Sequence, residues 1–394
     1  MLTVMKFGGS SVADLAHIRN VAQRCIEKQQ AGSQVVVVLS AMGKTTDGLI
    51  ATAKQITEKP SRREMDMLLA TGEQVSVSLM AITMIQMGVS AVSLNAWQVP
   101  MHTTSDYQNA RFKRIDTERI RKELDDNKIV IVTGFQGINK YDDITTLGRG
   151  GSDTTAVALA AELHADVCEI YTDVDGVYTA DPRIVPNAHK MEEVTYDEML
   201  EMASLGAKVL HSRCVEIAKK YGVELLVCSS LNRNSGTMVR EKTKMEKMLI
   251  SGVAKDTNVA RISIIGVPDR PGLAFKIFSK LSAKDINVDI ILQSIGRHGT
   301  KDISFTVTQD KMKEAIQVLE DYKSTIDAEN IVCDDKVAKV SIVGAGMETH
   351  AGIAAKMFEA MFDAQINIQM IATSEIKISV LIDVSDADRA VNAI

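Results

Sequence analysis

The segment Lys6–Ser11, with the sequence KFGGSS, contains residue types that can bind a phosphate group. Gly8 and Gly9 have no Cβ, so their backbone N–H groups can close on phosphate oxygens, and the N-terminus of a following helix would add a favourable dipole. Lys6 can place a compact cation on a transferred group. The segment lacks the spacing of a Walker A loop, and a tight turn without a ligand explains its glycines equally well.

A second glycine-rich segment, Gly148–Asp153 with the sequence GRGGSD, precedes a helix expected to run through Leu163. The planar guanidinium of Arg149 suits a carboxylate. Asp153 could hold an ammonium group, or it could cap the helix, a role that Ser152 could also fill. An arginine and an acid on one loop favour an amino-acid zwitterion as the ligand over a simple helix cap.

A third segment, Tyr171–Arg183 with the sequence YTDVDGVYTADPR, follows a strand expected over 167–172. It therefore lies at the carboxyl end of a sheet, where α/β folds bind ligands. Its aspartates suggest calcium, but the glutamate at the twelfth position of an EF-hand loop is missing. The cysteines and histidines show no ligand spacing either, so we expect no protein-built metal site.

Strands and helices alternate around these segments over about the first 230 residues, which predicts an α/β domain with a mostly parallel sheet. The run Val35–Leu39 is continuously apolar, as expected of a strand buried on both faces. Strands are expected over 4–7, 35–39, 89–94, 129–133, 167–172 and 223–227, and helices over about 14–30, 62–87, 196–203 and 207–220.

Length and composition limit the class of protein. A chain of 394 residues predicts two or three domains, and 45% hydrophobic with 24% charged residues is ordinary for a globular protein. The net charge of -6 argues against nucleic acid as a partner. The sequence has no apolar run of the roughly 20 residues that span a bilayer, and no signal peptide. Five widely spaced cysteines predict reduced thiols in a cytoplasmic protein.

The C-terminal part contains an internal repeat. The segment 260–266 resembles 338–344, and each copy continues with a glycine, a helix pattern, an Ile-Asn pair and a closing strand. Both copies predict the order β-α-β-β-α of a small ferredoxin-like module. A charged, apolar-poor stretch at 241–248 is the candidate linker before them. A duplicated structural appendage without a ligand remains an alternative.

These motifs, in this order, resemble the amino acid kinase family and, within it, the aspartate kinases. Ser40–Gly43, Thr45–Asp47, Gly72-Glu73 and 206–211 match the same family, and the repeats resemble paired ACT domains. The resemblance implies a three-layer α/β sandwich at 1–240 and two ferredoxin-like ACT domains. The first would cover 259–336. The second would combine 249–258 with 337–394, being interrupted by the first and shortened at its C-terminal end.

The resemblance also assigns roles to residues. Lys6, Arg149, Asp153 and Lys208 would be catalytic. The nucleotide, ATP with Mg²⁺ held mainly through its phosphates, would be bound by Lys6, Phe7, Gly8, Gly9, Thr172, Asp173, Tyr178, Thr179, Ala180, Asp181, Pro182, Arg183 and Lys208. Aspartate would be bound by Ser40, Thr46, Glu73, Arg149, Gly150, Gly151 and Ser152.

An end-product amino acid, lysine or threonine or both, would bind between ACT domains. The implied residues are Asp269, Arg270, Pro271, Gly272, Leu273, Ala274, Asn287, Val288, Asp289 and Gln293 in the first copy, and His350, Ala351, Asn367, Ile368, Ser374 and Glu375 in the second. A homo-oligomer formed through the ACT domains is expected, with a separate ACT-only regulatory subunit as a further expected partner.

The activity implied is phosphorylation of the side-chain carboxylate of L-aspartate. Two alternatives stay open: a related kinase for another small acid, and an amino-acid sensor whose kinase domain is inactive. Lys6, Arg149, Asp173 and Lys208 argue against the inactive sensor because each phosphate or substrate motif retains its charged residue.

Overall fold

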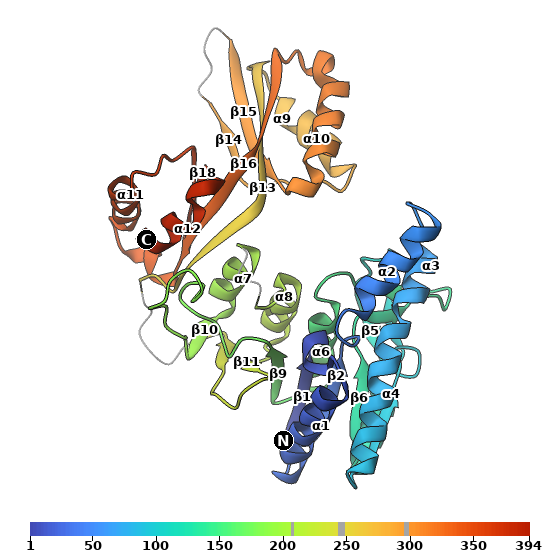
Figure 1. Cartoon of the computed structure of the whole chain (residues 1–394). Coiled ribbons are helices and arrows are strands. Elements are labelled where there is room, and N and C mark those ends of the chain that lie inside the picture. The colour runs from blue at the N-terminus through green and yellow to red at the C-terminus, as the bar shows by residue number, and fades with distance from the viewer. Residues whose placement is uncertain (206–208, 243–248, 295–298) are drawn as a thin grey trace. The chain divides into compact units, whose positions relative to one another are not determined.

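The computed structural model describes residues 1–205, 209–242, 249–294 and 299–394, apart from the side chains of 348 and 349 (Figure 1). It divides into two compact units. The first comprises Met1–Thr179, His189–Ser204 and Lys208–Glu246, and the second comprises Ala180–Ala188, Leu205–Ala207 and Lys247–Ile394. Four of the five free cysteines are buried, in agreement with the predicted packed thiols.

The first unit is built on an eight-stranded sheet in which every neighbouring pair of described strands is parallel except β11 and β12. Its strands, in sheet order, are β10 (Glu193–Thr195), β12 (Thr237–Arg240), β11 (Leu225–Ser229), β9 (Val167–Thr172), β1 (Leu2–Phe7), β2 (Gln34–Leu39), β6 (Ile129–Thr133) and β3 (Ala91–Leu94). The mostly parallel sheet confirms the predicted fold class.

Helices cover both faces of this sheet. Helices α1 and α4 pack on the face that carries Met5, Phe7 and Val37, whereas α6 contacts β1, β2 and β9 and pairs with α8. Asp14 caps α1 by accepting a hydrogen bond from the backbone N–H of His17. The helices of this unit are η1 (Gly9–Val12), α1 (Leu15–Gln30), α2 (Thr45–Ile56), α3 (Arg62–Leu69), α4 (Thr71–Gln86), α5 (Glu118–Asp125), α6 (Gly151–Leu163), α7 (Tyr196–Ser204) and α8 (Ser212–Tyr221).

The helix predicted over 62–87 is two helices, α3 and α4, which meet at Ala70. By length and composition, Arg62–Gln86 is apolar enough to cross a membrane. Val77, Met80 and Met84 instead lie in the core with the sheet, and this packing accounts for the apolar composition of α4.

A small four-stranded sheet, absent from the sequence-based expectations, lies within the same unit. Its order is β5 (Phe112–Ile115), β4 (Met101–Thr103), β7 (Gln136–Ile138) and β8 (Ile144–Thr146). Three of its strands have only three residues, too few to show a strand period in the sequence. This sheet ends directly before the Gly148 loop and so matters for the site.

The second unit has a six-stranded sheet shared by the two repeats. Its order is β14 (Ile291–Gln293), β15 (Thr300–Val307), β13 (Gly252–Pro268), β16 (Asn330–Val343), β18 (Lys377–Asp383) and β17 (Met370–Thr373). Its helices are α9 (Leu273–Ser282), α10 (Gln309–Tyr322), η2 (Lys323–Ile326), η3 (Ala345–Thr349), α11 (Ile353–Asp363), η4 (Val384–Asp386) and α12 (Ala387–Ala393).

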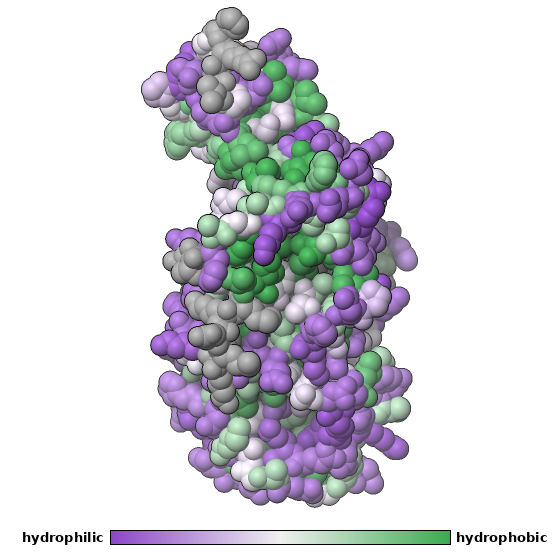
Figure 2. Space-filling view, turned by 90° about the vertical axis from the view of Figure 1, so that its left-hand side faces the viewer, coloured by the Kyte–Doolittle hydropathy of each residue, from purple (hydrophilic) through white to green (hydrophobic). Residues whose placement is uncertain are grey.

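Each repeat follows the predicted order β-α-β-β-α. The long strands β13 and β16 run through both repeats, and Gly252–Asp256 pairs with Lys339–Val343 of the second. Each repeat has its own core. Ala180 and Ala188 belong to the core of the second repeat. Apolar side chains also reach the surface of this unit (Figure 2), among them Phe275, Ile291, Leu292, Phe362 and Ile371.

Candidate active site

A cavity of about 750 Å³ opens in the first unit at the carboxyl ends of β1 and β2. Parallel strands end at one edge of a sheet, so the loops after β1 and β2 meet here, and the N-terminus of α6 closes the site. The lining residues are Lys6, Gly8, Gly9, Ser40, Ala41, Gly43, Thr46, Asp47, Ile50, Lys54, Pro60, Met65, Leu69, Glu73, Gln108, Phe135, Thr146, Gly148, Arg149, Gly150, Gly151, Ser152 and Asp153. Lys6 and Arg149 therefore line the same cavity.

Lys6 forms an ion pair with Asp153, with 2.6 Å between Nζ and Oδ1, and both side chains are largely buried. Asp153 and Ser152 lie inside α6, whose capping residue is Gly150 in the left-handed conformation at φ 67°. The helix-cap alternative for both side chains is therefore wrong. Asp153 instead fixes the lysine ammonium at the mouth of the Gly8-Gly9 turn.

The Gly8-Gly9 turn packs tightly on the loop after β2. A Cβ on Gly9 would lie 2.8 Å from the carbonyl oxygen of Ala41, and Gly43 donates its N–H to the carbonyl of Gly9 at 2.9 Å. Glycine is thus required by this contact whether or not a phosphate binds. Phe7, predicted to bind nucleotide, is fully buried and stacks on Tyr171 at 4.4 Å between ring centroids, so it supports the turn from the core.

The opposite part of the cavity carries groups suited to an amino acid. The exposed Arg149 side chain contributes a guanidinium, and Ser40 donates a hydrogen bond to the Ser152 hydroxyl at 2.9 Å. Glu73 is 3% exposed and accepts a hydrogen bond from the N–H of Ala41 at 3.1 Å. Burial raises the pKa of Glu73 to about 7.

The second carboxylate oxygen of Glu73 is buried and has no hydrogen-bond partner within the described part of the chain. A buried acceptor without a partner costs about 1–3 kcal/mol. The arrangement therefore suits a ligand that brings a donor, such as an ammonium group, into the cavity. Thr46, Gly150 and Gly151 line the same space.

The predicted nucleotide loop is divided between the two units. Thr172, Asp173, Tyr178 and Thr179 belong to the first unit, and Ala180, Asp181, Pro182 and Arg183 belong to the second. Within the first unit, Thr172 donates to Asp173 and the hydroxyl of Tyr178 donates to Asp175. None of these eight residues lines the described cavity, although β9, which ends at Thr172, pairs with β1 as far as Phe7 and Tyr171. Lys208 lies outside the described residues.

The predicted effector residues lie in the second unit, on loops and at the ends of α9 and β14. Gly272 and Gly352 adopt left-handed conformations that start α9 and α11, with Asp269–Ala274 and His350-Ala351 around them. Asn287, Val288 and Asp289 precede β14, which Gln293 ends; Asn367 and Ile368 precede β17, and Ser374 and Glu375 follow it. Asp269 forms an ion pair with Lys301 at 2.7 Å, and Asp289 forms one with Lys339. Both carboxylates thus already hold a lysine ammonium.

Several cavity residues were missed from the sequence. Asp47 and Lys54 lie on α2 with Thr46, and the helical spacing from Thr46 to Ile50 and Lys54 could have indicated this face. Gln108 and Thr146 had no such signal, because the small sheet that positions them was not expected. Within the described residues, no three His, Cys, Asp or Glu side chains gather into a metal site.

Comparisons with known proteins find matches to both parts of the chain. The model of the amino acid kinase family matches residues 1–229, and an ACT domain model matches 262–322 and 340–394. The aspartate kinase of Pseudomonas putida is 50% identical over 395 residues, covering 100% of this chain and 96% of that protein. The aspartokinase of Bacillus sp. (strain MGA3) is 49% identical, covering 100% of this chain and 96% of that one.

Solved structures show the same similarity. E. coli aspartokinase III in complex with aspartate and ADP (R-state) is similar with a TM-score of 0.87 at 25% identity, covering 100% of this chain and 98% of that chain. The same protein in complex with lysine and aspartate (T-state) gives a TM-score of 0.78 at 26% identity, with coverages of 99% and 98%.

Proposed function

Because this chain belongs to the amino acid kinase family and is an aspartate kinase with C-terminal ACT domains, we propose that it transfers the γ-phosphoryl group of ATP to the side-chain carboxylate of L-aspartate. The observation that carries the proposal is the single cavity shared by the Lys6–Asp153 ion pair and by Arg149, Glu73 and Ser152. The product would be 4-phospho-L-aspartate, which begins the synthesis of lysine, threonine and methionine.

The acceptor needs no general base, because an aspartate side chain with an ordinary pKa of about 3.9 is ionised at neutral pH. The difficulty is that two anions must approach each other. Lys6, held by Asp153, places a cation where the transferred group would lie, and Gly8 and Gly9, which line the same space, would donate their N–H groups to it. We propose Lys208 as a second cation. Catalysis then depends on alignment and on charge stabilisation.

Mg²⁺ would enter with ATP. The described residues offer no cluster of three ligating side chains, so the donor set fits a metal held mainly by phosphate oxygens, near Asp153. When bound there, it would neutralise charge on the transferred phosphoryl group. The adenosine would contact Thr172, Asp173, Tyr178 and the segment Thr179–Arg183.

The substrate side fits an α-amino dicarboxylic acid. Arg149 would pair with one carboxylate of aspartate, and the ionised Glu73 would accept from its ammonium group. Thr46, Ser40 and Ser152 would complete the hydrogen bonds.

Regulation is proposed for the second unit. Lysine accompanies aspartate in the related T-state structure, so we propose lysine, alone or with threonine, as the effector at the two glycine-opened helix starts. A typical coupling free energy would be about 1–3 kcal/mol. We further propose a homo-oligomer through the ACT domains, a separate ACT-only subunit as an additional partner, and a cytoplasmic location.

The deciding assay supplies ATP and Mg²⁺ with L-aspartate and traps the acyl phosphate with hydroxylamine. Faster turnover with aspartate than with glutamate supports the proposal. A preference for glutamate would contradict the substrate, and no turnover with any small acid would favour the inactive sensor. Lysine and threonine, titrated singly and together, test regulation; an unchanged rate in all three titrations would refute it.

A further inference from the structure

Asp66 is a fully buried acid on α3 whose carboxylate partners lie outside this helix, in the loop that contains Gln108 and at the end of β8. Its Oδ2 accepts hydrogen bonds from the backbone N–H of Gln108 at 3.0 Å and of Thr146 at 2.8 Å. Its Oδ1 accepts from the Thr146 hydroxyl at 2.8 Å. Burial raises the pKa of Asp66, while these three hydrogen bonds act in the opposite direction. One carboxylate thus joins two segments that are distant in sequence.

Both partners of Asp66 form the wall of the cavity next to Arg149. Gln108 and Thr146 line it, and Thr146 ends β8 three residues before Arg149. The two segments also contact each other, because Ala110 donates its N–H to the carbonyl of Thr146 at 2.9 Å. A Cβ on Gly148 would lie 2.9 Å from the carbonyl oxygen of Gln108. The position of the Arg149 loop therefore depends on where Gln108 and Thr146 are held.

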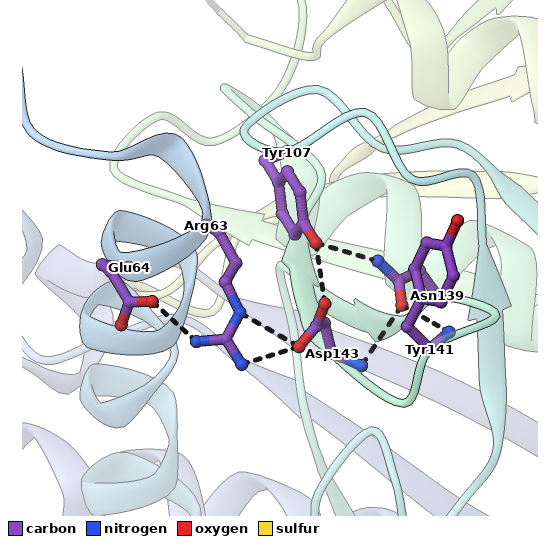
Figure 3. Close-up of polar contacts among 6 residues, drawn as sticks. All are labelled: Arg63, Glu64, Tyr107, Asn139, Tyr141 and Asp143. Atoms are coloured by element: carbon purple, nitrogen blue, oxygen red, sulfur yellow. Dashed lines mark hydrogen bonds and ion pairs between the residues drawn. The ribbon is translucent and has the colours of Figure 1, made fainter.

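A second contact from the same helix reaches the same two segments. Arg63 lies three residues before Asp66, on the same face of α3. Figure 3 shows its guanidinium directed at Asp143, with Nη2 2.7 Å and Nε 3.0 Å from Oδ1. The hydroxyl of Tyr107, the residue before Gln108, donates to the other oxygen of Asp143 at 2.8 Å. Asn139 donates to the same hydroxyl at 3.3 Å.

The two contacts differ in burial. Asp66 and Thr146 are buried, whereas the Arg63 side chain is 45% exposed and its ion pair is open to solvent. A solvent-exposed ion pair contributes little, and a buried carboxylate with three donors contributes more. Asp66 is therefore the principal connection between α3 and the wall of the cavity, and Arg63 is an auxiliary one.

We propose that Asp66 is a positioning residue for the amino-acid side of the site: through Gln108 and Thr146 it sets the place of the Arg149 loop, and so controls affinity for the dicarboxylic substrate. This inference rests on the proposed function, because it presumes that Arg149 binds that substrate. Asp66 itself does not line the cavity and contacts no reacting atom. Its loss should weaken binding of the amino acid and leave binding of ATP, on the Lys6 side, nearly unchanged.

The test compares KM for L-aspartate, KM for ATP, kcat and the melting temperature in a set of variants. We expect Asp66→Asn to raise KM for aspartate about tenfold, because the amide has one acceptor oxygen in place of two, with KM for ATP changed less than about twofold. Thr146→Val should act in the same direction, since it removes the hydroxyl donor, and Thr146→Ser should restore affinity. The matched control is Glu64→Gln, because the Glu64 carboxylate contacts Arg63 on the exposed side. This variant should behave as the unmodified protein.

Equal increases in both KM values, or a lower melting temperature with both KM values unchanged, would overturn the proposal and leave Asp66 as a stabilising residue only. If Asp66→Asn does not fold, the Thr146→Val and Thr146→Ser pair gives the same decision. The unmodified protein separates this inference from the proposed function. If it phosphorylates aspartate while the Asp66 and Thr146 variants show no selective KM effect, the inference fails alone.

Discussion

Replacing Glu73 by Gln tests whether the cavity contains a buried carboxyl group whose ionised form is available to the substrate. In the folded protein the pKa of Glu73 is about 7, whereas an ordinary glutamate has 4.5. The folded state therefore favours the protonated acid. The contribution of Glu73 to the free energy of unfolding is fully present below pH 4.5 and is lost as the pH rises toward 7. The reason is that the Glu73 carboxyl group ionises at a lower pH in the unfolded chain than in the folded protein.

The size of this effect follows from the two pKa values. At 1.36 kcal/mol per pKa unit, the rise from 4.5 to about 7 corresponds to a loss of about 3 kcal/mol between pH 4.5 and pH 8. Glu73→Gln cannot ionise and should not show this loss. Burying the amide NH₂ has its own cost, but that cost is the same at both pH values, so the difference between them isolates the carboxyl group.

Chemical unfolding of Glu73→Gln and of the unmodified protein at pH 5 and pH 8 measures this difference. We expect the variant to gain about 2–3 kcal/mol relative to the unmodified protein when the pH is raised. A relative stability that is the same at both pH values would refute the reasoning. In the unmodified enzyme, KM for aspartate should also increase as the pH falls below 7, because only the ionised Glu73 pairs with an ammonium group.

Three further predictions follow from the site. Lys6→Ala should lower kcat by about two to three orders of magnitude, as does removal of an oxyanion donor, while the protein still folds; a near-normal rate would exclude the phosphate role. Asp153→Asn should lower kcat while retaining ATP binding, measured by titration calorimetry, because Lys6 loses the carboxylate that fixes it; an unaltered kcat would show that the ion pair is dispensable. Gly9→Ala should lower the melting temperature, since its Cβ would approach the carbonyl of Ala41 to 2.8 Å, and an unchanged value would mean that the loop adjusts freely.

Six of the eight strands of the large sheet could be predicted from the sequence because they are short apolar runs, whereas β10 and β12 were not expected. The strands predicted over 129–133 and 167–172 coincide with β6 and β9. The small sheet could not be predicted in this way, because its strands are too short to show a period and one of its pairings, β4 with β7, joins residues distant in sequence. The break at Ala70 was missed for another reason: α3 and α4 both continue the helical pattern.

The cavity was predictable where a motif and a predicted strand end coincide, as at Lys6 and Ser40, or where a motif opens a helix, as at Arg149; these three residues line one cavity. A residue whose side chain accepts hydrogen bonds from backbone N–H groups need not belong to a recognisable motif. In the sequence, Asp66 is only an acid within a predicted helix, and its role becomes visible when its partners Gln108 and Thr146 are known. These partners lie in or next to a sheet that was not predicted from the sequence. Motif reading therefore finds the groups that face a ligand and misses the groups that hold them in place.

Asp153 shows why even a correct motif leaves a role undecided. An aspartate early in a helix can cap it or bind a cation, and the sequence favoured an amino-acid ligand over a cap without indicating Lys6 as the partner. Gly150, in the left-handed conformation, occupies the capping position. Asp153 therefore lies in the first turn of α6, where its carboxylate forms the ion pair with Lys6 at the end of β1. The glycines of GRGGSD thus have a second effect besides allowing close approach of a ligand. They set the start of α6 so that the Asp153 carboxylate lies beside the Lys6 ammonium of β1. The proposed catalytic lysine, Lys6, and the loop proposed to bind the amino acid are thus joined by an ion pair that could be found only from the fold.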